Sequence, residues 1–276
     1  MSPVESDEEY LTRKQRREQA RSERKAAEEA AVSDAAKRRR LAQLGGAVAV
    51  VVVAIVVVLI ATGGSSSSKP PEVTSTTATK QVSAVTKELA GTTQKGIVLG
   101  NPNAPVTMQY YGDLECPICR DFTLGALPPI ITKWVKTGKL KIEYRSLETA
   151  TREPETFRTQ QIAALAAGKQ NKAWNYIETF YHEQGEEGSG YVTESYLKGL
   201  AQQVPGLNLT QWTTDRGNQQ YQAQIAVDTQ EANNNGFTGT PAFLIGKTGS
   251  GLKKYEYSSL TDPSGFNEAI EKALKG

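Results

Sequence analysis

Cys116 and Cys119 form a C-x-x-C pair, and they are the two cysteines of this 276-residue chain. An apolar, β-prone run at 106–111 (VTMQYY) precedes the pair, and a plausible helix that opens with Arg120 follows it. This order places the first thiol at a helix N-terminus, where the helix dipole and unpaired backbone N–H groups favour thiolate over thiol. Because the thiolate is the species that exchanges disulfides, the pair is predicted to be redox-active.

Two other interpretations of the pair are a small structural disulfide and part of a metal site. A disulfide that spans two residues closes a very small loop and constrains the unfolded chain little. A closed zinc site needs about four ligands, whereas the chain offers two cysteines and one histidine, His182. We therefore expect no metal and no cofactor, with a site shared between chains as the remaining metal interpretation. His182 is expected at a helix end and not as a catalytic base.

An uncharged stretch at 44–62 (LGGAVAVVVVAIVVVLIAT) is long enough to cross a bilayer as one helix. The basic cluster at 37–40 (KRRR) precedes it and a neutral flank follows it. The positive-inside rule therefore predicts that residues 1–43 are cytoplasmic and that the C-terminal part is extracytoplasmic. The alternatives are a buried core helix and a cleaved signal peptide. The long charged N-terminal region and the long apolar stretch favour an uncleaved, single-pass anchor in the cell membrane.

Cysteine usage and charge agree with this compartment. An exported domain works where disulfides persist, and a chain with no cysteine outside its C-x-x-C avoids wrong pairings. The net charge of +2 comes from residues 1–43, which carry 11 Lys and Arg against 9 Asp and Glu, while the remainder balances at 21 against 21. The exported part therefore shows no nucleic-acid footprint. The tail is expected to be a solvated helix or a disordered segment that meets anionic lipid, with a dedicated cytoplasmic partner as the alternative.

Residues 63–95 are rich in Ser, Thr, Gly and Pro and are predicted to be a linker between the anchor and a catalytic domain. The domain is expected at 96–276, a length that suffices for one sizeable core. Between about 150 and 236 the apolar periodicity is helical, which predicts a helical insertion in an α/β domain. The other patterns predict strands at 106–111, 140–147, 242–246 and 252–257, and helices at 127–136 and 266–275.

A second motif, Gly239-Thr240-Pro241-Ala242-Phe243, places a proline directly before a short apolar strand. Proline cannot donate a ladder hydrogen bond, so Pro241 fits the first residue of a strand. The Thr240–Pro241 bond is open to either isomer, because cis peptide bonds are largely confined to X-Pro.

The C-P-x-C after a strand, together with the downstream G-T-P-A-F, resembles the thioredoxin superfamily. The long helical segment between the two motifs resembles its DsbA-like branch of exported disulfide oxidoreductases, and the resemblance covers about residues 96–276. It implies a thioredoxin-like fold with Cys116 as the exposed nucleophile and Cys119 as the buried resolving thiol. It also implies that Pro241 is a cis-proline facing the cysteines and that the Thr240 backbone pairs with an extended substrate peptide.

The dipeptide between the cysteines, Pro117-Ile118, is expected to tune the site. Pro117 suits the first turn of a helix. The strong oxidants of the DsbA-like branch carry histidine where this chain has Ile118, and isoleucine offers the thiolate neither charge nor a hydrogen-bond donor. We therefore predict a pKa of roughly 5–7 for Cys116, above the value of about 3.5 for the histidine-containing oxidase.

These features predict a membrane-anchored, extracytoplasmic thiol-disulfide oxidoreductase that forms disulfide bonds in exported proteins. Its expected partners are cysteine-containing clients, a membrane redox protein that recycles the site, and the bilayer around 44–62. A disulfide reductase or isomerase is the alternative within the same class. From a different class, a chaperone-like module would bind peptides at Thr240 and Pro241 and keep the cysteines as a structural disulfide.

Overall fold

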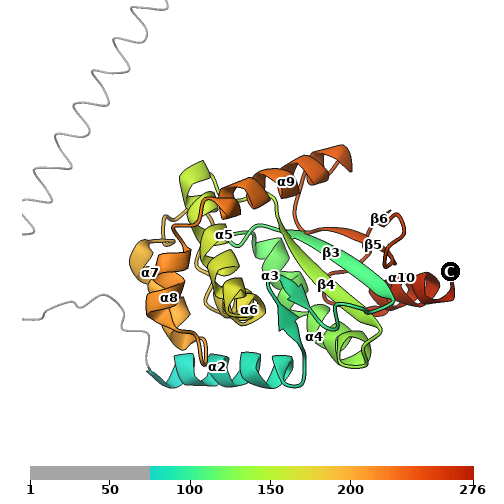
Figure 1. Ribbon diagram of the computed structural model, residues 1–276, viewed down its shortest axis with the longest axis horizontal. Coiled ribbons are helices and arrows are strands. Elements are labelled where there is room, and N and C mark those ends of the chain that lie inside the picture. Colours follow the sequence, from blue (N-terminus) through green and yellow to red (C-terminus); the bar gives the residue numbers. More distant parts are fainter. Residues whose placement is uncertain (1–74) are drawn as a thin grey trace, which may run out of the picture. The chain divides into compact units, whose positions relative to one another are not determined.

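The computed structural model describes residues 75–276 (Figure 1). The predicted cytoplasmic tail, the predicted membrane span at 44–62 and the first part of the predicted linker lie outside these residues. Within 75–276, no helix combines the length and the apolar character that a membrane crossing requires.

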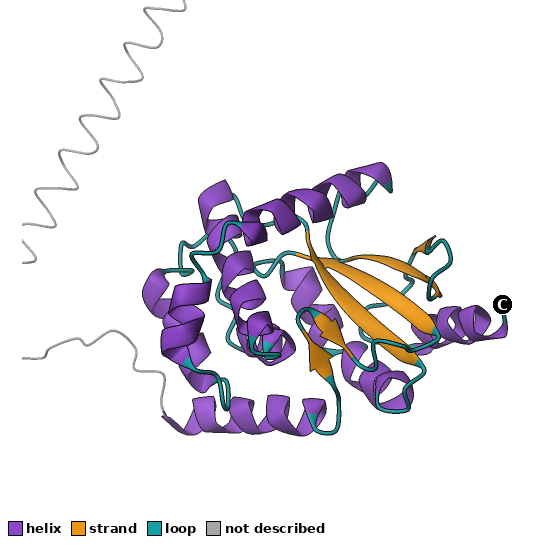
Figure 2. Cartoon of the chain, in the orientation of Figure 1, coloured by secondary structure: helices purple, strands orange, loops and turns teal. Residues whose placement is uncertain are grey.

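A mixed sheet, drawn in orange in Figure 2, lies among the helices of the described domain. Its six strands have the spatial order β1-β2-β4-β3-β5-β6. The central strands β3 and β4 are parallel, and the other neighbours pair antiparallel. The strands are β1 Gln94–Lys95, β2 Val98–Leu99, β3 Val106–Gly112, β4 Leu140–Ser146, β5 Ala242–Lys247 and β6 Lys253–Tyr255.

Ten further elements of the described residues surround the sheet, and five of them lie between β4 and β5 in the chain. Parallel neighbours require a crossover connection, and α3, α4 and the π-helix η1 supply it between β3 and β4. The elements are α2 Ser75–Leu89, α3 Pro117–Leu124, α4 Leu127–Ile130, η1 Ile131–Val135, α5 Pro154–Lys169, α6 Ala173–His182, α7 Glu194–Gln203, α8 Leu209–Asp215, α9 Gln220–Asn234 and α10 Ser264–Lys275.

Strand β3 is buried on both of its faces except at the half-buried Gln109, which explains why its sequence is mostly apolar. On one face, the Tyr110 ring packs against Phe122 of α3 and Phe243 of β5, with ring centroids 5.0 Å and 5.5 Å away. On the other face, Tyr111 packs against Phe237, which follows α9, at 5.1 Å. The α/β class and the thioredoxin-like arrangement predicted from the sequence are confirmed.

The predicted linker at 63–95 is wrong over its second half, because residues 75–95 belong to the domain. Helix α2 covers Ser75–Leu89, and its Val85 and Leu89 side chains are buried in the main core. With the half-buried Val82, they form the short apolar stripe of a segment that is rich in Ser, Thr and Lys. Such a narrow stripe is a weak periodic signal, and packing against α6 stabilises the helix where its propensity does not.

The remaining elements follow the predicted pattern with shifted ends. The helical segment expected at about 150–236 corresponds to helices α5 to α9. The helix expected at 127–136 is divided into α4 and η1, and the edge strand expected at 252–257 is the shorter β6. The terminal helix α10 begins at Ser264, two residues before the predicted start.

Candidate active site

The C-x-x-C pair lies where the central strand β3 passes into α3. Cys116 is the N-cap residue of α3 with extended backbone (φ −72°, ψ 117°), and Pro117 occupies the first helical turn. The strand ends at Gly112, where an added Cβ would lie 2.8 Å from the Tyr144 ring. Glycine at this position therefore lets the backbone turn above the core and present Cys116 at the helix N-terminus.

The Cys116 side chain is 5% exposed, so it is less accessible than the family resemblance implied, and its thiol has several hydrogen-bond partners. Its Sγ donates to the Thr240 carbonyl oxygen over 3.4 Å. A hydrogen bond from the Cys119 thiol, opposed by burial, lowers the pKa of Cys116 to about 7, with further help from Thr240 and from the backbone N–H groups of Ile118 and Cys119. This pKa lies at the upper end of the range expected from the sequence. The thiolate of Cys116 is therefore more accessible near neutral pH than that of an ordinary cysteine.

Cys119 is fully buried beneath Cys116. Burial raises its pKa well above the ordinary thiol value, and the Cys116 thiol beside it acts in the same direction. The Tyr110 hydroxyl lies below, 3.4 Å from the Cys119 carbonyl oxygen and 3.1 Å from the Tyr181 hydroxyl. The two thiols thus differ strongly in acidity, with the outer one acidic and the inner one held protonated.

The second motif meets the cysteines because β5 pairs antiparallel with β3, with Ala242 opposite Tyr111. The Thr240–Pro241 peptide bond is cis and immediately precedes β5. The Thr240 hydroxyl shares a short hydrogen bond with Thr149, which lies after β4. The structure therefore brings Cys116, Cys119, Thr240 and Pro241 to one end of the sheet, as the sequence motifs suggested.

A buried carboxylate, Asp113, fixes the backbone around the site and was not anticipated from the sequence. Its Oδ2 accepts hydrogen bonds from the backbone N–H groups of Thr149, Ala150 and Thr151 at 2.9–3.0 Å. Its Oδ1 accepts from the Glu115 N–H at 3.1 Å and from the Thr151 hydroxyl at 2.6 Å. This side chain ties the loop before Cys116 to the loop that carries Thr149. Only its place between a strand and the C-x-x-C marked it in the sequence.

The charged and polar side chains next to the motif support the backbone and do not reach the thiols. Arg120 donates from Nε to the Tyr181 carbonyl oxygen at 3.0 Å, at the end of α6. Gln184 donates from Nε2 to the carbonyl oxygens of Leu114 and Cys116 at 2.7 Å and 3.1 Å. His182 is the last residue of α6, and burial and Arg120 lower its pKa. Within 75–276, no cluster of His, Cys, Asp or Glu is suited to a metal ion.

Two exposed apolar side chains lie at the rim of the site. Ile118 is 44% exposed and Tyr257 is 37% exposed. The Tyr257 ring packs edge-to-face on Phe243 at 5.9 Å, and its pKa is raised by burial and by the two nearby cysteines. Exposed large apolar residues beside a nucleophile offer a contact surface for an unfolded polypeptide.

The fold and this dithiol site define a thiol-disulfide oxidoreductase of the DsbA-like type. A family model described as thioredoxin matches residues 92–272, more than half of the chain. The chain therefore belongs to the thioredoxin family.

Several known proteins that resemble the chain carry names from disulfide chemistry. Disulfide bond formation protein D of Bacillus subtilis is 23% identical over 184 residues, which cover 65% of this chain and 77% of that protein. The probable disulfide bond formation protein D of Bacillus anthracis is 21% identical over 178 residues, covering 64% and 77%. The crystal structure of oxidised BdbD from Bacillus subtilis matches with a TM-score of 0.55 and 21% identity, covering 67% of this chain and 98% of that chain.

The Ile118→His substitution is expected to lower the pKa of Cys116 below about 7, because an imidazolium at the exposed 118 position would stabilise the thiolate. Each unit of pKa is about 1.4 kcal/mol, or about 30 mV in the potential of a two-electron couple, so the disulfide should become a stronger oxidant. Thiolate absorbance against pH and equilibration with glutathione measure the two quantities. Ile118→Gln, polar but uncharged, is the control. Unchanged values in the histidine variant would show that this dipeptide does not tune the site.

Proposed function

We propose that the protein is a membrane-anchored, extracytoplasmic oxidoreductase that introduces disulfide bonds into exported proteins. The uncharged stretch at 44–62 and the basic cluster before it support the anchor and its orientation. The names of the Bacillus relatives support the direction of the reaction. The partners in this proposal are cysteine-containing clients and a membrane redox protein that reoxidises the site.

The proposed reaction starts from the Cys116–Cys119 disulfide. A client thiolate attacks the Cys116 sulfur, the bond between the two cysteines breaks, and Cys119 leaves as a thiolate that takes up a proton. A second client thiolate then attacks the client sulfur of the mixed disulfide and releases Cys116 as a thiolate. The client gains one disulfide, and its two electrons remain in the reduced Cys116–Cys119 pair.

The placement of the two thiols is the observation that carries the proposal: Cys116 lies at the N-terminus of α3 beside the Thr240 carbonyl oxygen, and Cys119 is fully buried. The pKa directions agree with this placement. A thiol of lower pKa is the better leaving group in disulfide exchange. With its pKa of about 7, Cys116 leaves readily when a client thiol resolves the mixed disulfide. The Cys119 side chain is fully buried, and this burial keeps it away from client sulfurs and raises its pKa. We also propose that the Thr240 backbone, beside Cys116 Sγ, pairs with the client segment that contains the reacting cysteine.

The reduction potential tests the direction of the reaction. A Cys116 pKa of about 7 is well above the value of about 3.5 for DsbA, so we expect a weaker oxidant than DsbA at about −120 mV. We expect a value between about −120 and about −220 mV, measured by equilibration with a glutathione series. Within this range the oxidised protein should restore activity to reduced, unfolded RNase.

The same experiment separates the alternative. A potential near about −270 mV, as in thioredoxin, together with rapid insulin reduction and no RNase oxidation, would make the protein a reductase. The proposed disulfide donation would then be wrong, although the class of oxidoreductase would stand.

A further inference from the structure

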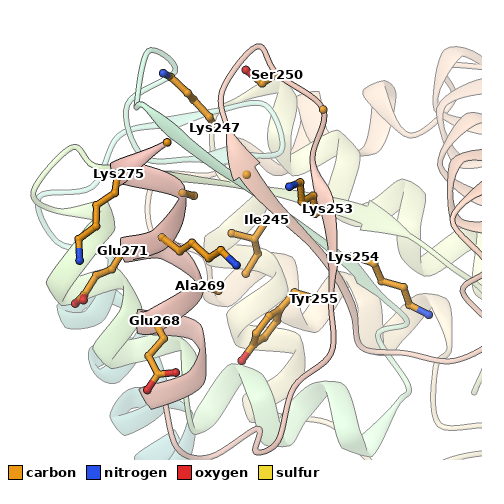
Figure 3. A pocket seen from close by; sticks show the side chains of 15 residues that line it. Ile245, Lys247, Ser250, Lys253, Lys254, Tyr255, Glu268, Ala269, Glu271 and Lys275 are labelled. Atoms are coloured by element: carbon orange, nitrogen blue, oxygen red, sulfur yellow. The ribbon is translucent and has the colours of Figure 1, made fainter.

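A groove with a volume of about 890 Å³ lies between the β5–β6 hairpin and helix α10 (Figure 3). Its strand side begins at Ile245 and continues through Lys247. The active site lies at the opposite end of the same strand, where Pro241 precedes Ala242. The groove is therefore separate from the cysteines.

Strand register decides which side chains face this groove. Ile245 pairs with Lys253, and Phe243 pairs with Tyr255, so these four residues share the face of the sheet that α10 covers. Lys254 pairs with Leu244 on the other face, where its ammonium lies 5.4 Å from the centroid of the Phe237 ring. Ile245, Lys253 and Tyr255 therefore face α10 across the groove, and Lys247, Ser250 and Lys254 complete the strand side in Figure 3.

Helix α10 supplies the opposite wall with a regular pattern. Ala269, Lys272 and Ala273 line the groove at the i, i+3 and i+4 spacing of one helical face. The two alanines are small, so the floor between helix and strand is apolar and open, and Ile245 lies beneath it. Lysines stand along the edges of this floor on both elements.

The charges around the groove are unbalanced. Glu271 forms an ion pair with Lys133, 3.2 Å away. Five lysines line the groove, and one of them, Lys254, forms an ion pair with Glu256 at 2.9 Å. Within 75–276, no carboxylate forms an ion pair with the other four, and Glu268 is the one further glutamate that lines the groove. These lysines are Lys247, Lys253, Lys272 and Lys275.

Protection of a sheet edge explains only part of this pattern. Lysines on an edge strand discourage edge-to-edge pairing, which accounts for Lys253 on β6. Lys272 and Lys275 belong to α10 and protect no strand edge. Cationic groups on both sides of an apolar floor are complementary to a ligand that carries carboxylates and apolar groups together.

We propose that this groove binds an extended acidic segment of a polypeptide, with apolar side chains on the Ile245–Ala269–Ala273 floor and carboxylates on the lysines. A concave floor below a lysine rim admits side chains, whereas a flat bilayer surface would meet only the rim. The inference deepens the proposed function, on which it rests: a client held at the groove is kept at high effective concentration near Cys116.

Binding of a fluorescent, cysteine-free peptide that alternates Glu and Leu to the full-length protein tests the proposal. Lys253→Glu combined with Lys272→Glu should raise its Kd by about tenfold or more, the equivalent of about 1.4 kcal/mol. The charge-matched control is Lys80→Glu with Lys198→Glu, two exposed lysines on α2 and α7, and it should change Kd by less than about twofold. Ala273→Phe, which fills the floor and leaves every lysine in place, should also weaken binding.

Three results would overturn the assignment. The first is a rise in Kd in the control variant that equals the rise in the groove variant. The second is equal affinity for a peptide that alternates Lys and Leu. The third is a groove variant that loses binding to phosphatidylglycerol vesicles while its peptide affinity is unchanged. The last result would assign the lysines to lipid. Because the peptide has no thiol, its binding is independent of disulfide exchange. If RNase oxidation fails while peptide binding is intact, the proposed function is contradicted and the peptide-binding groove is not.

Discussion

Cys116→Ala is expected to reduce both RNase oxidation and insulin reduction to the uncatalysed rate. Cys119 would be the one remaining thiol, and it is fully buried with a raised pKa, so it cannot replace the outer nucleophile. Because Cys116 is itself only 5% exposed and small, alanine should be accommodated without disturbing the fold. Recovery of RNase activity and turbidity of reduced insulin measure the two reactions, with circular dichroism as the check on folding.

The companion variant, Cys119→Ser, cannot form the Cys116–Cys119 disulfide and should lose RNase oxidation, but its outer thiol can still react with client disulfides. Cys116 would attack a client disulfide and stay in the mixed disulfide, because no inner thiol is present to resolve it. Bands of high mass that collapse on reduction would report the trapped complexes. Equal or greater trapping by Cys116→Ser would contradict the roles proposed for the two cysteines. The chaperone-like alternative would be favoured by two results together: the wild-type protein shows no measurable turnover, and the Cys116→Ala variant still binds clients.

The second large effect is expected from a pair of acidic side chains between α2 and α6. Glu178 is fully buried, and neither of its carboxyl oxygens has a hydrogen-bond partner within the described residues. Burial and the neighbouring Glu88 raise the pKa of Glu178 well above its usual value. Burial also raises the pKa of Glu88 to about 7, although Lys136 acts in the opposite direction.

The direction of the pH dependence follows from these shifts. The folded protein holds protons on Glu88 and Glu178 at pH values where the unfolded chain has lost them, so the free energy of unfolding falls as pH rises. The loss begins near the usual carboxyl pKa of about 4.5 and continues through about 7 for Glu88. At higher pH, ionisation of the buried Glu88 and Glu178 weakens the packing of α2 on α6 and lowers the free energy of unfolding.

Glu178→Gln is therefore expected to stabilise the protein at pH 8 and to change little at pH 4.5. The amide cannot ionise, and its NH₂ group can donate to Glu88. Relief of an unsatisfied buried group amounts to about 1–3 kcal/mol, and each kcal/mol raises Tm by about 2–4 °C for a domain of this size. Thermal melts between pH 4.5 and 8 measure the change in Tm, with Glu186→Gln, a substitution at an exposed glutamate, as the control. A wild-type stability that is flat over this range would contradict the prediction.

Helix α2 makes tertiary contacts that its sequence pattern does not indicate. Ser, Thr and Lys dominate its sequence, and only Val85 and Leu89 reach the core. Yet α2 also donates a hydrogen bond from Gln81 Nε2 to the His182 carbonyl oxygen, 3.4 Å away at the end of α6. Because the partners are 101 residues apart, no local pattern indicates the contact.

Arg120 illustrates the same limit inside the active site. Its proximity to Cys116 in sequence left open whether its charge stabilises the thiolate. The structure directs the guanidinium to the Tyr181 carbonyl oxygen, and the groups that lower the pKa of Cys116 are instead Cys119, Thr240 and backbone N–H groups. The orientation of the Arg120 side chain, and not its separation from Cys116 along the chain, determines whether its charge acts on the thiolate.

The local sequence predicted the cysteine pair at a strand-to-helix junction and the proline directly before β5, because cysteine spacing and proline geometry act between residues adjacent in the chain. The thioredoxin-like class was predicted from the resemblance of the two motifs, and of the helical segment between them, to a known superfamily. The tertiary structure alone placed Thr149 and Asp113 beside the motif, joined α2 to the domain, paired Glu88 with Glu178 and opened the lysine-lined groove. These features arise from strand register and helix packing between distant segments, whose contacts leave no period in the sequence from which they could be predicted.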